Sequence, residues 1–426
     1  MKGISEGIFR NRSFLDYFGM NLSSRTAGAV TNVSVIWFVF AVTHSAIDVA
    51  IVGLAASVAT VIVTLPAGVW IDRYNRRALL LFSNALRAAC LVMLALITIE
   101  AGFQLLAVIV FSLVWNGANE LYRSTDHSVL PELVGPDEVA DANGVTIAGY
   151  NLLGSFSSAL GGALIVLAGA VLAFIYSAAG YIIAAVFSLF LLLRLGAVGK
   201  KKVGRAGKGK AMMGNEIREG MRWLITQRGL LELSLSAVIF NFLFGVTFYF
   251  LVIYVGVGVG AGAFLFGAIL AAFVIGGAAG ALLVGRTDAV RHAGKVWLLV
   301  NGACAGALML LLGVFPTVPV ALCAGFGIGL VSGFGGNVWL SSAQNLVPTP
   351  MRGRYFAIDG LLSFIGGPPS IVVGGILITV IGVVKVYEIA GALLLLSALA
   401  FTPMKSLWNL DGRPSAGSVV EPEHDV

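Results

Sequence analysis

Charged residues are scarce in this chain: Asp, Glu, Lys and Arg make up 11% of its 426 residues, whereas soluble proteins contain about 25%. This shortage argues against a water-soluble enzyme. Hydrophobic residues make up 58%, and they form continuous runs about 20 residues long, which is the length that crosses about 30 Å of hydrocarbon as a helix. A transmembrane β-barrel would instead show alternating segments about ten residues long. The composition therefore predicts a polytopic helical membrane protein.

Cysteine and histidine are also rare. The cysteines, Cys90, Cys304 and Cys323, lie in apolar runs without Cys-x-x-Cys spacing, so the sequence predicts neither a disulfide framework nor a metal site. The four histidines are scattered along the chain. A membrane-embedded enzyme or a signalling protein would need a catalytic or metal-binding cluster, or a soluble domain. The sequence contains neither, and we predict no enzymatic activity and no cofactor.

Twelve apolar runs are separated by charged residues or by Pro and Gly. The predicted spans lie near residues 15–42, 46–70, 78–99, 103–122, 144–168, 171–195, 231–255, 263–284, 295–315, 319–341, 360–381 and 384–404. We therefore predict an all-α membrane protein of two six-helix bundles. The predicted units are an N-terminal bundle at 1–195, a cytoplasmic basic linker with an amphipathic helix at 196–230, a C-terminal bundle at 231–404 and a disordered cytoplasmic tail at 405–426.

Basic residues lie almost entirely on one side of these spans. With twelve spans, the loops on the side of the termini hold 22 of the 27 Lys and Arg residues, and only Lys385 falls in an opposite loop. Since cytoplasmic loops are rich in Lys and Arg, we predict that both termini are cytoplasmic and that the protein is a multi-pass protein of the plasma membrane. The net charge of +6 then reflects topology, not a nucleic-acid partner.

Several features recur about half a chain apart. Gly161 and Gly162 return as Gly374 and Gly375 after 213 residues, and Asp72 returns as Asp288 after 216 residues. Six-span halves of the same polarity predict two pseudo-symmetric bundles related by an axis along the membrane normal. Transporters built in this way carry their site between the halves, near mid-depth.

The loop after the second predicted span reads GVWIDRYNRR from Gly68. It closely resembles the signature loop of the major facilitator superfamily, in which a Gly is followed by Asp-Arg and then by a basic pair. The candidate gating residues are Gly68, Asp72, Arg73, Arg76, Arg77 and the weaker second copy Asp288. The resemblance implies alternating access of two halves. It also implies that Asp72 is held near residues 355–360 in the outward-facing state.

The motif from Leu130 to Val134, LPELV, looks like the macrolide-efflux and siderophore-export branch of that superfamily. Two positions depart from the exporter pattern. Ser157 and Ser158 stand where exporters often carry Gly-Pro ahead of a Gly-Gly, and Leu113 stands where an Arg is expected. These departures weaken the case for drug–proton antiport.

Polar side chains recur at helical spacing in four predicted spans, and such stripes mark a watery cavity or a polar contact between helices. The candidate substrate or proton cavity contains Asn21, Arg25, Asn32, Asn116, Asn119, Glu120, Asn241, Phe244 and Asn337. Arg25 lies too deep to reach the interface, so Glu120 is its predicted partner. Either the pair braces two helices, or Glu120 exchanges a proton or a cationic substrate while Arg25 tunes its affinity.

These observations predict a secondary active transporter that moves a small amphiphilic molecule by alternating access, preferably as proton-coupled efflux. The alternative on the same fold is uptake or facilitated diffusion of a polar metabolite. The expected partners are a small-molecule substrate, protons as coupling ion and the lipid bilayer. We expect the protein to be a monomer.

Overall fold

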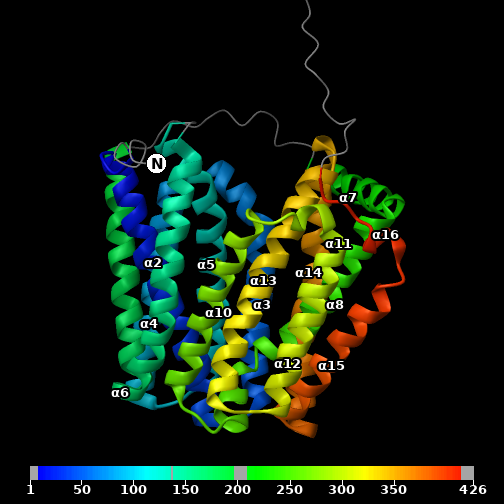
Figure 1. The fold of residues 1–426 in the computed structure, drawn as a ribbon. Coiled ribbons are helices and arrows are strands. Elements are labelled where there is room, and N and C mark those ends of the chain that lie inside the picture. The colour runs from blue at the N-terminus through cyan, green and yellow to red at the C-terminus, as the bar shows by residue number, and fades with distance from the viewer. Residues whose placement is uncertain (1–7, 136–137, 196–208, 414–426) are drawn as a thin grey trace, which may run out of the picture.

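The computed structural model describes residues 8–135, 138–195 and 209–413, and the elements in these ranges are helical. The first half contains α2 (Arg12–Thr43), α3 (Ala46–Arg73), α4 (Arg76–Ala101), α5 (Leu105–Leu133) and α6 (Val139–Leu195). By length and composition, eleven helices in the described part of the chain are long and apolar enough to cross a membrane. The protein is therefore an all-helical, multi-pass membrane protein (Figure 1).

The second half is more irregular. It contains α7 (Gly209–Thr226), α8 (Arg228–Phe248), α9 (Leu251–Ile253), the π-helix η2 (Tyr254–Gly258), α10 (Ala263–Val284), the 3-10 helix η3 (Ala289–His292), α11 (Ala293–Val296), the π-helix η4 (Trp297–Cys304), α12 (Ala305–Val314), α13 (Val318–Leu346), α14 (Thr349–Ile381), α15 (Val383–Phe401) and α16 (Lys405–Trp408). Residues 289–314 together are long and apolar enough for one crossing.

The long helix α6 is made of two arms that meet at Gly169, where the backbone is not helical (φ 78°, ψ 176°). Along the first arm, Gly149 faces Phe18 of α2 and Gly161 faces Val30, so this arm runs parallel to α2. Along the second arm the order is reversed, since Gly180 faces Ala27 and residue 194 pairs with residue 16. The chain therefore turns back at Gly169, a backbone conformation that glycine adopts readily.

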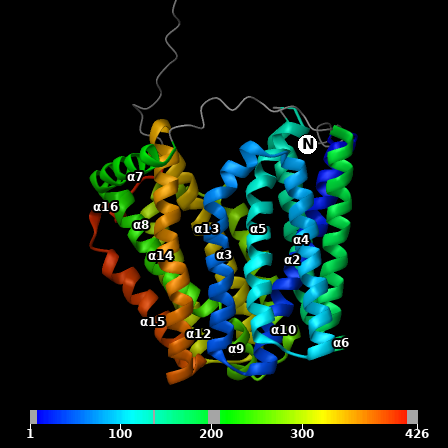
Figure 2. The same cartoon turned by 180° about the vertical axis from the view of Figure 1, so that it is seen from behind.

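The backbone conformation at the helix termini differs between the two ends of the molecule. The described residues with positive φ, namely His44, Gly102, Gly169, Gly260 and Gly382, all lie in turns at one end, which we call the far end. The opposite end, which we call the basic end, carries the turn at 74–75, the start of α2 and the helices α7 and α16 (Figures 1 and 2). There, Asn11 and Asn75 cap α2 and α4 by accepting from backbone N–H groups.

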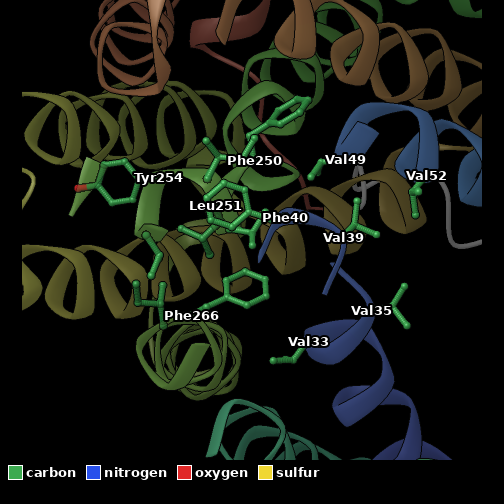
Figure 3. Close-up of a cluster of buried hydrophobic side chains, with 14 of the residues drawn as sticks. Val33, Val35, Val39, Phe40, Val49, Val52, Phe250, Leu251, Tyr254 and Phe266 are labelled. Carbon is green, nitrogen blue, oxygen red and sulfur yellow. The ribbon is translucent and has the colours of Figure 1, made fainter. Parts of the chain in front are cut away.

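The two halves contact each other in the part of the molecule nearer the far end. Gly162 of α6 lies directly against Ala263 and Phe264 of α10, and Gly267 lies against Ser158. Phe40 of α2 similarly contacts η2. Figure 3 shows the buried cluster in which α2 and α3 meet α9 and α10. Close approach of these helices needs glycine, because a Cβ at such positions would overlap the neighbouring backbone.

At the basic end, α7 packs against α8 and α14. Glu219 pairs with Arg354 at 3.0 Å, Gly220 lies against Ile358, and Leu224 is fully buried. A helix thus lies within the predicted linker, and its described part packs on the second bundle.

The predicted start of the disordered tail, at residue 405, is too early in the chain. Residues 405–413 are ordered because Leu407 of α16 is buried and the Asn345 side chain donates to the Gly412 carbonyl at 3.0 Å. Residues 414–426, like the basic segment at 196–208, lie outside the described residues.

Candidate functional site

The first half holds a buried arginine at its centre. Arg87 of α4 is 1% exposed and lies eleven residues into the helix, about 16 Å from the basic end at 1.5 Å per residue. Its guanidinium donates to Asn84 at 2.6 Å, to Asn119 of α5 at 3.0 Å and to Ser24 of α2 at 3.0 Å. One cation therefore links three helices through hydrogen bonds.

Two aromatic rings cover the Arg87 guanidinium. Its carbon lies 4.3 Å from the centroid of Tyr122 and 4.4 Å from that of Tyr181. Such cation–π contacts partly replace the solvation that the buried charge has lost. Arg87 was not among the predicted site residues, because its place between two tyrosines depends on how α5 and α6 pack against α4.

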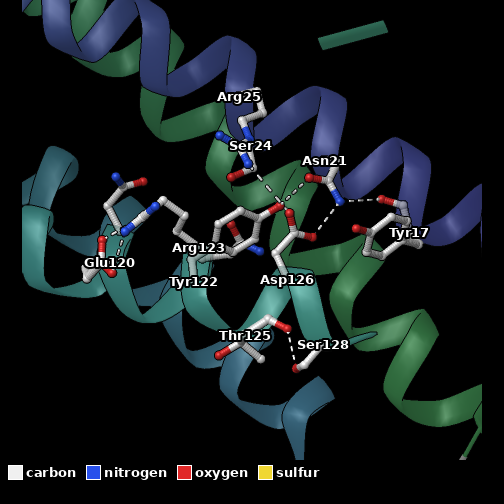
Figure 4. Close-up of polar contacts among 12 residues, drawn as sticks. Tyr17, Asn21, Ser24, Arg25, Glu120, Tyr122, Arg123, Thr125, Asp126 and Ser128 are labelled. Atoms are coloured by element: carbon white, nitrogen blue, oxygen red, sulfur yellow. Dashed lines mark hydrogen bonds and ion pairs between the residues drawn. The ribbon is translucent and has the colours of Figure 1, made fainter. Parts of the chain in front are cut away.

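A second cluster lies between α2 and α5 (Figure 4). Asp126 is 4% exposed and accepts a hydrogen bond from Asn21 at 3.0 Å, while its second oxygen lies 3.6 Å from Arg25. Asn21 in turn accepts from Tyr122 at 3.1 Å. The two clusters share Tyr122 and form one polar network inside the first bundle.

The predicted pairing of Arg25 with Glu120 is wrong. Glu120 instead accepts both hydrogen bonds of a bidentate contact with Arg123, each at 2.9 Å, and Arg25 pairs with Asp126. The physical reason is that residues three apart on one helix are direct neighbours, so Arg123 satisfies Glu120 within α5. Asp126 had no place among the candidate residues, although its spacing from Asn119 and Tyr122 follows one helix face.

The remaining polar candidates make local contacts. Asn116 donates to the Ser112 carbonyl and Asn337 to the Gly333 carbonyl, both within their own helices at 2.8 Å. Asn32 and Asn337 are exposed. Asn241 of α8 lies beside Gly366 of α14. In the part of the chain that is described, these residues do not join the network around Arg87.

The second half presents an apolar surface in contrast. Phe244 stacks on Phe240 and Phe248 along α8, with centroids 5.6 and 5.1 Å apart, and Phe273 of α10 lies 5.3 Å from Phe248. A cavity next to these rings is lined by Phe244, Phe248, Phe273, Ile269, Met309 and Ile328. The stretch from 233 to 285 contains no charged residue. Phe244, the aromatic member of the candidate cavity residues, therefore lies on an aromatic face of α8.

The signature loop divides into a paired and an exposed part. Arg76 and Arg77 pair with Glu132 at 2.6 and 3.4 Å, which ties the start of α4 to the end of α5. Gly68, Asp72 and Arg73 are exposed, and so is the second copy at position 288. Among the described residues, Asp72 makes no hydrogen bond or ion pair, so the contact with α14 that the resemblance implies is not formed in this conformation.

The loop therefore has both the residues and the position of a signature loop, at the turn between α3 and α4. The sequence profile of the Major Facilitator Superfamily matches residues 17–370. The chain belongs to the Major Facilitator Superfamily. A search of curated proteins gave no significant match. Membership makes this major facilitator a membrane transporter rather than an enzyme.

Solved structures of transporters share the fold of this major facilitator. A bacterial homologue of the human lysosomal transporter Spinster, inward-facing and unoccupied, is 15% identical with a TM-score of 0.65, covering 98% of this chain and 100% of that one. An inward-facing bacterial homologue of the iron transporter ferroportin is 15% identical with a TM-score of 0.71 and coverage of 92% and 98%. The nucleoside transporter NupG is 13% identical with a TM-score of 0.70 and coverage of 92% and 99%. These identities establish the fold alone.

Proposed function

We propose that this major facilitator is a secondary active transporter that moves a small amphiphilic molecule by alternating access of its two halves. The contrast between the halves carries the proposal. Arginine, carboxylate and amide groups cluster in α2, α4 and α5, while the other half offers an aromatic and aliphatic cavity. The apolar part of such a molecule suits the cavity, and its polar part suits the open edge of the polar cluster, where the side chains of Arg25 and Arg123 are 31% and 54% exposed.

The proposed topology has twelve crossings in a plasma membrane, with six helices in each bundle. It rests on the reversal of α6 at Gly169, where the backbone is not helical, so that the two arms of α6 make two crossings. The positive loops place the basic end and both termini in the cytoplasm. Because the halves contact each other nearer the far end, this conformation then faces inward.

Proton-coupled efflux is the proposed mode, with uptake or facilitated diffusion of a polar metabolite as the alternative on the same fold. Carboxylates buried in the first bundle support coupling, since ionisable groups inside a membrane mark proton or substrate pathways. The resemblance of residues 130–134 to macrolide and siderophore exporters supports the outward direction. We propose a monomer as the working unit.

The test uses purified full-length protein. Amphiphilic compounds are first screened by thermal shift in detergent, and each ligand found is then followed in proteoliposomes with an imposed pH gradient. Efflux by proton exchange predicts uphill accumulation when the compartment that receives the ligand is acidic. Accumulation in the opposite direction would establish uptake, and equilibration without accumulation would establish facilitated diffusion.

A matched pair of variants tests the apolar cavity. Phe244→Ala removes a ring that lines it, whereas Phe38→Ala removes a ring that packs against Phe103 and Phe174 within the first bundle. We expect only the Phe244 variant to weaken ligand binding after both are corrected for stability. Equal binding by both variants would exclude the cavity from the substrate site.

A further inference from the structure

The apolar cavity of the second half is a pocket with one open side. The rings of Phe244, Phe248 and Phe273 lie on that side and are partly exposed. The other lining residues, such as Ile269 of α10 and Met309 of α12, are buried. A ligand that enters the pocket must therefore pass between the three rings, so that one narrow end of it enters first.

The two hydroxyl groups that line the pocket already donate to backbone carbonyls. The Thr247 hydroxyl donates to the Phe244 carbonyl at 2.9 Å, and the Tyr387 hydroxyl donates to the Thr247 carbonyl at 2.6 Å. None of the described lining residues is charged. A charged or strongly polar end of a ligand would lose its water in the pocket and find neither a charged partner nor a free side-chain donor, which is unfavourable. The pocket therefore suits an uncharged hydrocarbon end.

The size of the pocket limits how much of such an end can enter. Its volume is about 40 Å³. One water-sized group needs about 10 to 15 Å³ of cavity, so the pocket has room for about three methyl or methylene groups. The small side chain of Ala321 on α13 leaves this room open, while the buried side chain of Met309 occupies the α12 side. Gly325 cannot give more or less room without a shift, because a Cβ there would lie 2.8 Å from Ile269.

We propose that this pocket binds the alkyl end of the substrate and that Ala321 and Met309 set the chain length that it accepts. The substrate class is then an amphiphile that ends in a short hydrocarbon chain free of polar atoms. Each CH₂ group that becomes buried strengthens binding about fourfold, so the affinity rises with chain length until the pocket is full. Longer chains gain nothing further. This inference rests on the proposed transport of a small amphiphilic molecule.

The experiment measures how n-alkyl amides of increasing chain length bind to the full chain in lipid nanodiscs, by isothermal titration calorimetry. The neutral head group is the same throughout the series, and titrations of empty nanodiscs correct for partition into lipid. For the wild type we expect a gain of about fourfold per CH₂ that ends at a limiting length. A gain that continues through the whole series, or no binding of any member, would overturn the proposed pocket.

Two substitutions should move the limiting length in opposite directions. Ala321→Leu fills the pocket, so it should shorten the limit by about three carbons and weaken binding of the longest amide that fits the wild type about 60-fold. Ala321→Val should give an intermediate limit. Met309→Ala enlarges the pocket and should lengthen the limit by about three carbons. Met93→Ala, which removes a methionine side chain that is exposed on α4, should leave the limit unchanged.

Opposite shifts cannot arise from misfolding, because a loss of folded protein lowers the amount that binds at every chain length alike. If the limiting length is the same in the Ala321 and Met309 variants as in the wild type, these residues do not set it and the proposal is wrong.

Transport of the same amides in proteoliposomes separates this inference from the proposed function. Limiting lengths that shift as expected in a protein that transports none of the amides would support the pocket and count against transport of amphiphiles. Transport whose dependence on chain length is unaffected by both substitutions would support the proposed function and overturn the role of Ala321 and Met309.

Discussion

Replacing Gly162 by alanine tests whether the crossing of α6 and α10 sets the conformation of the transporter. A Cβ at this position would lie 2.9 Å from the Cα of Phe264 and even closer to the Ala263 carbonyl oxygen, whereas ordinary contacts begin at 3.4 Å. The helices must therefore separate by about 0.5 Å or more. Overpacking of this kind costs about 1 to 3 kcal/mol. The cost applies only while the far ends of the halves are together.

We therefore expect Gly162→Ala to shift the equilibrium toward separated far ends by about 5-fold to 150-fold, the equivalent of 1 to 3 kcal/mol. Gly154→Ala is the matched control, because it lies on the same arm of α6 with no atom near the added Cβ. Spin labels at the exposed residues Ile47 and Val257 would report the distance between the halves by double electron-electron resonance. Identical distance distributions for the two variants would refute the reasoning.

Three further outcomes are expected. Arg87→Lys should lower the free energy of unfolding by about 1.5 to 3 kcal/mol for each hydrogen bond lost, because one ammonium cannot reproduce the planar contacts to three side chains. An unchanged unfolding midpoint in detergent would contradict this expectation. Asp72→Asn should leave thermal stability unchanged, since Asp72 is exposed here. The same variant should reduce the population of molecules whose basic end is closed. Unaltered distances between the two halves at the basic end would exclude a gating role for Asp72. A cysteine at Arg76 should react with an impermeant reagent only in opened membranes, and labelling of intact cells would reverse the proposed topology.

Local sequence patterns predicted the all-helical membrane fold and the superfamily. Most apolar runs became separate helices close to their expected bounds, because a run of about 20 apolar residues in lipid must satisfy its own backbone hydrogen bonds as a helix. The fifth and sixth runs form the two arms of α6, which meet at the non-helical Gly169. The signature loop was identified from ten consecutive residues, and Asn75 within it caps α4 as a local feature.

Partners between helices were decided only by the tertiary structure. The sequence placed Arg25 and Glu120 in the membrane, but their depths and facing sides depend on how α2 and α5 are rotated and shifted relative to each other. Close contacts such as Gly28 beside Tyr181 and Gly149 beside Phe18 hold α2 against α6, and the hydrogen bonds of Asn21 with Tyr122 and Asp126 join α2 to α5. Asp126 became the partner of Arg25 through this packing. Periodicity along one helix carries no information on which helix lies opposite. Composition and spacing therefore determined the membrane fold, whereas packing between helices determined the polar network.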